Sequence, residues 1–291
     1  MKGKMFVIDS NYQGIPQVPS QDTYQASPTP YSVGAPSGNS SERTVIDDEQ
    51  IKRMMKENKP SFMEKYGSCI VTLALIALNV VIYGVEVLLS GFNTSISTLV
   101  LFDMGAMYAP AILSPAGWYR FITPMFLHID LMHLLFNMAA LYSAGVLLER
   151  YLGRWNFLLL YFIAGISGNA LSYMADIMTG AYYVSAGAST SIFGLFVAMA
   201  LLGVLAKRNR VILRQYSKGM LAVIGINIVY TLLMPSVSVS GHLGGALGGL
   251  IGMFIIPSKN LRVPVVVRVI VAVLWVVVMG YVLHFTLPLG W

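Results

Sequence analysis

Apolar stretches recur along the chain at the length that a helix needs to cross a membrane. A spanning helix contains about 20 predominantly apolar residues. The charged residues fall mostly between these stretches. Hydropathy therefore predicts an all-α polytopic membrane protein with seven spans, at about residues 68–90, 124–147, 155–175, 184–206, 219–235, 238–256 and 264–286.

The first connection, residues 91–123, is long but not polar. It carries two prolines, Trp118 and several tyrosines. Aromatic residues with a polar edge are typical of the membrane–water interface. We therefore expect this segment to lie in the interface and not to span the bilayer.

The N-terminal part has a different composition. Residues 10–45 are rich in Ser, Pro, Gln, Tyr and Gly, which predicts a disordered tail. Residues 46–59 place acidic before basic side chains and favour a short juxtamembrane helix, either a lipid-touching regulatory segment or, the favoured interpretation, a solvated linker. No apolar run precedes Asn11, so no cleavable signal peptide is expected. The predicted parts are an N-terminal tail with the juxtamembrane helix (1–65), a membrane core (66–260) and an additional C-terminal transmembrane helix (261–291).

Basic residues are distributed unequally between the two sides of the predicted spans. All but one of the 19 Lys and Arg residues fall on one side, and Arg120 is the exception. The positive-inside rule then places the N-terminus in the cytoplasm and the C-terminus outside. The net charge of +6 thus follows the topology and is no argument for binding nucleic acid.

Composition supports the membrane assignment and limits the chemistry. Hydrophobic residues make up 56% of the chain and charged residues only 11%, roughly half the share found in soluble domains. The single cysteine, Cys69, excludes an intramolecular disulfide and a cysteine-based metal cluster.

Four polar side chains lie near the outer ends of three alternate spans. With the predicted topology, the second, fourth and sixth spans all run inward, so their N-terminal ends share one depth. His133 and Asn137 stand one turn apart on the second span, Ser189 lies about five residues into the fourth, and His242 is near the start of the sixth. One such residue has ordinary structural explanations. Four at one depth indicate a shared site facing the bundle interior.

These side chains suit acyl transfer. A serine hydroxyl becomes a nucleophile when a base such as histidine lies beside it. Amide, imidazole and backbone N–H groups can stabilise the oxyanion of the tetrahedral intermediate. Gly187 would allow the tight turn that aims such N–H groups before Ser189.

The sixth span also carries glycines at every fourth position. Small residues at this spacing let helices pack closely. Close packing of the fourth and sixth spans would bring His242 within reach of Ser189. The two rows are Gly241, Gly245 and Gly249, and Gly244, Gly248 and Gly252.

The chain resembles the rhomboid family of intramembrane serine proteases over about residues 101–256. Three motifs in the family's order make the resemblance specific. The matching segments are Gly105-Ala106, the aromatic–Arg pair ending at Arg120, HIDLMHLLFN with His128, His133 and Asn137, GASTSIFG around Ser189, and GHLGG around His242.

This resemblance implies a six-helix bundle core with a Ser-His dyad in a water-filled cavity open to the outer face. It implies Ser189 as nucleophile and His242 as general base. It also implies His133, Asn137 and the Ser189 N–H as the oxyanion site. The extra span at 264–286 resembles the appended seventh helix of some members.

Two positions depart from the family pattern. Tyr119 precedes Arg120 where many members have Trp. Phe193 replaces the Tyr that packs on the base, which keeps the stacking but loses a hydroxyl. His128 lies five residues from His133 and hence, we expect, on another face of the span in a structural role.

Other classes of protein fit less well. A channel or transporter would place ionisable residues near the midplane or break its helices there, whereas the carboxylates fall near span ends. An inactive rhomboid-like binder of membrane proteins is the main alternative, but such relatives lack the Ser or the His. No H-E-x-x-H motif and no paired transmembrane aspartates occur. The carboxylates in or near the spans are Glu86, Asp130, Glu149 and Asp176.

The resemblance thus predicts an endopeptidase that cuts transmembrane segments near the extracytoplasmic face. Expected substrates are single-span membrane proteins with small or helix-breaking residues near the cut. Membrane lipid is the other expected partner, and no nucleic acid, cofactor or metal is expected. The expected location is a bacterial-type plasma membrane. The substrate's identity, the role of the tail and the oligomeric state stay open.

Overall fold

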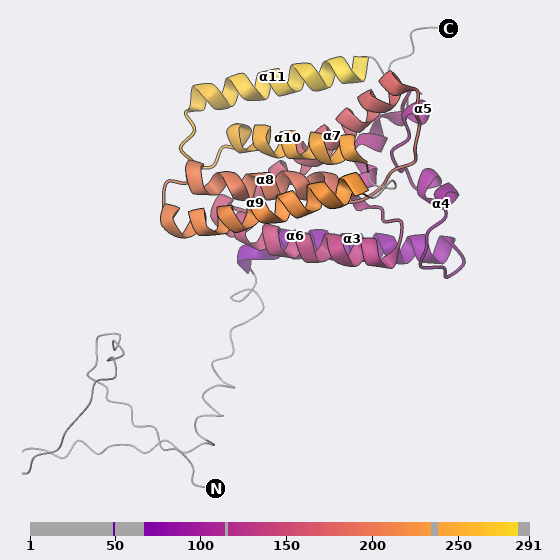
Figure 1. Ribbon diagram of the computed structural model, residues 1–291, viewed down its shortest axis with the longest axis horizontal. Coiled ribbons are helices and arrows are strands. Elements are labelled where there is room, and N and C mark those ends of the chain that lie inside the picture. Colours follow the sequence, from indigo (N-terminus) through magenta and orange to yellow (C-terminus); the bar gives the residue numbers. More distant parts are fainter. Residues whose placement is uncertain (1–48, 50–66, 114–115, 234–237, 285–291) are drawn as a thin grey trace, which may run out of the picture. The chain divides into compact units, whose positions relative to one another are not determined.

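The described part of the chain is helical. The computed structural model describes Glu49 and residues 67–113, 116–233 and 238–284, and no strand occurs within them. The predicted all-α class is therefore confirmed, whereas the predicted tail, apart from Glu49, and residues 285–291 lie outside the described residues. In chain order the elements are η1 (Gly67–Cys69), α3 (Ile70–Leu89), α4 (Thr98–Asp103), α5 (Ala109–Ile112), η2 (Gly117–Phe121), η3 (Thr123–Phe126), α6 (Leu131–Leu152), α7 (Arg154–Thr179), α8 (Ser189–Leu205), α9 (Arg210–Leu233), α10 (Val239–Ile255) and α11 (Val265–His284) (Figure 1).

Helix α7 lies at the centre of the bundle. It packs against α6, α8, α10 and α11, and most of it is buried. Its side chains Phe157, Leu160 and Tyr161 are fully enclosed in the main apolar core. Helix α9 packs against α8, and α3 packs mainly against α6.

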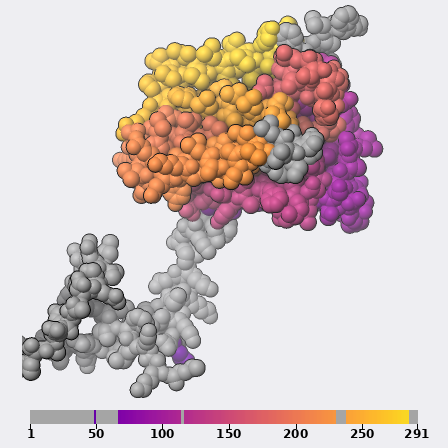
Figure 2. Space-filling view, viewed as in Figure 1, coloured from indigo at the N-terminus to yellow at the C-terminus, as the bar shows by residue number. Residues whose placement is uncertain are grey.

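The outer helices present apolar side chains to their surroundings. Helices α9 and α11, orange and yellow, cover much of the visible face in Figure 2. Val266 and Val277 of α11 and Val211 and Ile226 of α9 are mostly exposed. An apolar surface of this kind is suited to contact with lipid chains, as expected of an integral membrane protein. Within the described residues, four helical stretches are long and apolar enough to span a bilayer, at 67–89, 131–152, 154–179 and 265–284, while α8 and α10 are apolar but have 17 residues.

Glycines allow α8 and α10 to touch backbone to backbone. A Cβ added at Gly245 of α10 would lie 1.9 Å from the carbonyl oxygen of Thr190 in α8. A Cβ at Gly249 would lie 2.1 Å from the carbonyl oxygen of Gly194. The predicted close packing of these two helices is therefore confirmed, and any side chain at these two glycines would force the helices apart.

Three helices begin at other residues than hydropathy predicted. Helix α6 begins at Leu131, not near 124, because Pro124 lies in η3 and the Asp130 carboxylate caps the new helix by accepting the His133 N–H at 2.8 Å. Helix α8 begins at Ser189, not near 184, because Gly187 has a φ of +142° that no helix contains. Helix α9 begins at Arg210, not near 219, so its first turns carry basic residues that were expected in a loop.

The described residues between α3 and α6 form short helices and loops, and none of these elements is long enough to span. Arg120, in η2, is buried and holds this segment together. Its Nη1 donates to the carbonyl oxygens of Phe102 and Ala106 at 2.9 and 2.7 Å, and its guanidinium lies over the Phe102 ring. Asn169 of α7 donates to the carbonyl oxygen of Phe121 at 2.9 Å, which ties the segment to the central helix.

Candidate active site

Ser189 and His242 meet at one end of the α8–α10 contact. His242 Nε2 lies 2.9 Å from Ser189 Oγ, a hydrogen-bond distance. Ser189 is the first residue of α8 and His242 stands in the first turn of α10, so the glycine-mediated contact between these helices sets the separation. His242 is only 9% exposed. The structure thus pairs a hydroxyl with an imidazole in the geometry that activates a serine nucleophile.

Phe193 holds the imidazole in place. Its ring stacks on that of His242 with centroids 4.0 Å apart and planes at 18°. Phe193 lies one helical turn after Ser189 on α8, so the stacking ring and the hydroxyl approach His242 from the same helix. At the start of α10, Ser238 caps the helix by accepting the Gly241 N–H at 3.0 Å. The stacked ring restricts how the His242 imidazole can turn, and the cap fixes where its helix begins.

Gly187 opens the space in which His133 faces Ser189. A Cβ at this glycine would stand 2.9 Å from His133 Nε2 and 3.4 Å from Ser189 Oγ. Its φ of +142° also suits glycine alone. The Gly187 N–H donates to the carbonyl oxygen of Pro124 at 2.9 Å, which fixes the turn before α8. Only a residue without a side chain lets the imidazole of α6 reach this point.

Asn137 lies one turn after His133 on the same helix and is 6% exposed. Its Nδ2 is buried without a hydrogen-bond partner within the described residues. Buried donors of this kind are normally satisfied, so an unpaired one calls for an explanation. The first-turn N–H groups of α8 likewise have no partner within their own helix. Asn137 is thus a buried donor on the helix that carries His133, whose ring is the α6 group that lies beside Gly187 and Ser189.

His128 is not placed as we expected. It precedes α6 and so does not lie on a face of that helix. Its ring instead contacts His133 edge-on, with centroids 5.2 Å apart and planes at 61°. The error arose because hydropathy extended the span to residue 124, which made helical spacing the wrong measure of distance. The side chain is fully buried, and its structural role stays a prediction.

Sequence reasoning missed several residues that build the site. The Met107 and Ser185 backbones exchange hydrogen bonds of 2.9 Å and tie the interfacial segment to the turn before α8. Glu86 of α3 is fully buried and accepts the His128 N–H. A glutamate within an apolar span was the one available signal, and its proximity to a span end concealed it.

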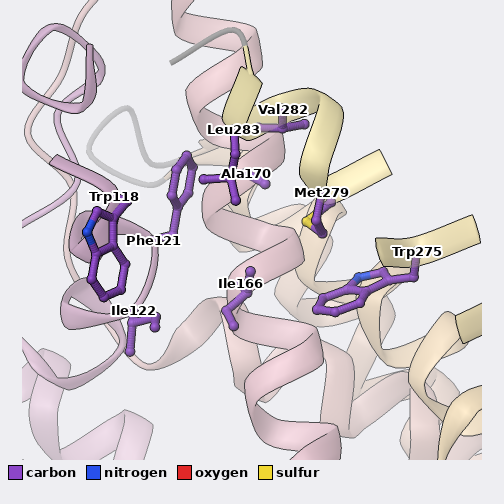
Figure 3. Close-up of a pocket in the computed structure, with 9 residues that line it drawn as sticks. All are labelled: Trp118, Phe121, Ile122, Ile166, Ala170, Trp275, Met279, Val282 and Leu283. Atoms are coloured by element: carbon purple, nitrogen blue, oxygen red, sulfur yellow. The ribbon is translucent and has the colours of Figure 1, made fainter. Parts of the chain in front are cut away.

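An apolar pocket of about 210 Å³ lies elsewhere, between η2, α7 and α11. Trp118 and Phe121 line one side of it and Trp275 and Met279 the other (Figure 3). It contains none of the polar side chains described above, so it is no part of this site. Among the described residues no group of three or more His, Cys, Asp or Glu side chains could hold a metal ion.

Comparisons with known proteins agree with the motifs. A model of the Rhomboid domain matches residues 115–259. Rhomboid protease GluP of Bacillus subtilis is 34% identical over 196 residues, which are 67% of this chain and 35% of that protein. Putative rhomboid protease YdcA of the same organism is 36% identical over 145 residues, 50% of this chain and 70% of that protein. Rhomboid protease AarA of Providencia stuartii is 28% identical over 243 residues, 76% of this chain and 85% of that protein.

Proposed function

Because the chain belongs to the rhomboid family, we propose that it is an intramembrane serine endopeptidase with a Ser189–His242 dyad. The 2.9 Å contact between His242 Nε2 and Ser189 Oγ is the observation that carries the proposal. The relatives named as rhomboid proteases support it. Cleavage of a model transmembrane substrate by the purified protein, beside a Ser189→Ala variant, is its direct test.

In the proposed reaction, Ser189 Oγ attacks the carbonyl carbon of the scissile peptide bond while His242 Nε2 takes the hydroxyl proton. His133, Asn137 and the Ser189 N–H stabilise the negative charge that forms on the carbonyl oxygen. His242 then gives its proton to the leaving amine as the C–N bond breaks. A water molecule, deprotonated by His242, hydrolyses the acyl-enzyme and frees Ser189. Gly187, Phe193, His128 and Arg120 support these groups without reacting.

The proposed substrates are transmembrane segments of single-span membrane proteins, cut near the extracytoplasmic face. An extended backbone is needed at the scissile bond, because helical hydrogen bonds cover the carbonyl group. Small or helix-breaking residues there would lower the cost of unwinding. The enzyme itself contacts membrane lipid, and a bacterial-type plasma membrane is its proposed location.

The proposed domain organisation follows the sequence. Residues 1–65 form a cytoplasmic tail, 66–260 the catalytic membrane core and 261–291 an appended helix. Described residues 265–284 are α11, which packs against α7 and α10. An inactive rhomboid-like binder is the alternative function, and the presence of both members of the dyad argues against it.

The two ends of the chain are expected on opposite sides of the membrane. A reporter fused before Met1 should be cytoplasmic and one fused after Trp291 extracytoplasmic, because nearly all basic residues fall on one predicted side. Compartment-specific reporter activity in intact cells measures this. Reporters on one and the same side would contradict the topology and the shared depth of the site residues.

Asn137→Ala should slow the enzyme without inactivating it. Loss of one oxyanion donor typically lowers kcat by about 10²- to 10³-fold, and His133 and the Ser189 N–H would still stabilise the charge. Labelling of Ser189 by a fluorophosphonate should stay measurable. Cleavage rates and probe labelling of the purified variant test this.

The matched control is Asn156→Ala. Asn156 is a partly buried asparagine in the first turn of α7, where its amide donates to the Leu152 carbonyl. This variant should cleave at the parent rate. Parent-like cleavage by Asn137→Ala would remove Asn137 from the oxyanion site.

A further inference from the structure

Glu86 is a buried carboxyl that the proposed reaction does not use. It lies three residues before the last residue of α3 and is fully enclosed by protein. Its Oε1 and Oε2 lie 3.1 and 3.3 Å from the backbone nitrogen of His128, 42 residues further along the chain. An acidic side chain is costly to bury in this setting, so its contact with one backbone N–H calls for a reason.

The N–H that Glu86 accepts belongs to the short segment before α6. In that segment the Ile129 carbonyl accepts the Ile96 N–H at 2.8 Å, and Asp130 caps α6 through the His133 N–H. Through its hydrogen bond with the His128 N–H, Glu86 of α3 therefore holds this segment in place. The segment sets where α6 begins and therefore how its first turn faces Ser189.

A single residue separates Glu86 from the oxyanion side of the site. The backbone of His128 is bound by Glu86, and the ring of His128 packs edge-on against the ring of His133 at 5.2 Å. The His133 ring in turn lies against Gly187, beside Ser189 Oγ. A displacement of the His128 backbone would therefore move the ring that supports His133.

We propose that Glu86 is a positioning residue, whose carboxyl holds the backbone of His128 and thereby orients the His133 imidazole toward the oxyanion. The inference rests on the proposed protease function. Without an acceptor, the buried His128 N–H must shift to find another partner. Errors of about 1 Å in placing a catalytic group can lower the rate by about 10²-fold.

Glu149 provides a matched control. It is also a buried carboxyl that joins α3 to α6, since it accepts the N–H groups of Val71 and Thr72 at 2.9 and 2.7 Å and the Thr72 hydroxyl at 2.7 Å. It lies near the opposite end of α6 from His133. Glu149→Met should therefore lower the unfolding temperature but leave kcat of the folded protein unchanged.

The first experiment compares kcat and KM of the purified full chain with those of Glu86→Met and Glu86→Gln. Glu86→Met should lower kcat roughly 10- to 100-fold with little change in KM, because the substrate still binds but the oxyanion donor is misplaced. Glu86→Gln should restore most of kcat, because its amide oxygen still accepts the N–H. If Glu86→Met does not fold, Glu86→Asp, whose carboxylate is one methylene shorter, should show the same loss of kcat. Unchanged kcat in the folded apolar or shortened variant would overturn the proposal.

The second experiment places Glu86→Met in a His133→Ala background. If Glu86 acts through His133, the double variant should be no slower than His133→Ala alone, whereas multiplying losses would contradict the proposal.

A third readout does not depend on activity. The chain has four histidines, and the imidazole NMR signals of His133 should shift in Glu86→Met and stay in place in Glu149→Met.

The readouts separate the two proposals. A parent protein that neither cleaves a substrate nor labels at Ser189 would refute the protease function. The His133 signals would then still decide whether Glu86 orients that ring. Signals that do not move in Glu86→Met would refute the positioning role even in an active enzyme.

Discussion

Replacement of His242 by alanine should abolish both substrate cleavage and labelling of Ser189 by a fluorophosphonate probe. The hydroxyl lies 2.9 Å from His242 Nε2, and without that base it is a poor nucleophile at neutral pH. Ser189→Ala should be equally inactive. The expected loss in kcat is roughly 10⁶-fold, the size found when a serine protease loses its nucleophile or its base. Gel-based cleavage of a transmembrane substrate and probe fluorescence measure the two effects.

The control for the nucleophile is Ser191→Ala. Ser191 is a buried serine two residues further along α8. This variant therefore also removes one serine hydroxyl from the same helix, but not the hydroxyl of Ser189. It should keep cleavage and labelling. If His242→Ala labels like the parent while His133→Ala does not, the two histidines have the opposite roles. Absence of labelling in every background would instead favour a binder, a transporter or a metal-dependent function.

Gly245→Ala should disrupt the fold around the site and with it the activity. The added methyl group would lie 1.9 Å from the carbonyl oxygen of Thr190, and a backbone atom of a packed helix cannot move aside as a flexible side chain can. The two helices must separate, which should lower the free energy of unfolding by about 3 kcal/mol or more. Ser189 and His242 stand at the end of this contact, so cleavage should fall as well. Thermal unfolding in detergent, followed by circular dichroism, and cleavage assays test both parts.

Gly280→Ala is the matched control within another helix. Gly280 lies in α11, and a Cβ there would meet no atom within 4 Å. Alanine also favours helix more than glycine does. This variant should be at least as stable as the parent and fully active. Equal stability of Gly245→Ala and the parent would mean that α8 and α10 are not as close as described.

The long helices that the structure describes could be predicted in order from the sequence, but several of their ends could not. Each long helix from α3 to α11 overlaps a stretch that hydropathy marked as a span. Hydropathy averages over many residues and does not take single hydrogen bonds into account. The start of α6 depends on the side chain of Asp130, and the start of α8 depends on the backbone of Gly187. The pattern therefore placed Ser189 inside a helix that it in fact begins.

The candidate site, too, could be predicted from the sequence only in part. Ser189, His242, His133 and Asn137 stood out in the sequence because polar groups are rare in apolar spans, whatever the fold around them. Their catalytic roles stay predictions, while the structure brings the first two to hydrogen-bond distance. The match of Phe193 to a stacking ring was likewise available from the motif, and the ring does stack on His242.

The sequence by itself therefore determined which segments are apolar helices and which side chains could react, because both follow from the chemistry of neighbouring residues. Only the tertiary structure decided which atoms meet. Glu86 finds its partner 42 residues away, and His128 contacts His133 from outside the helix. Such contacts depend on how α3 and the segment before α6 pack together. No periodicity along the chain encodes them, since a buried carboxyl binds whichever N–H the fold places beside it.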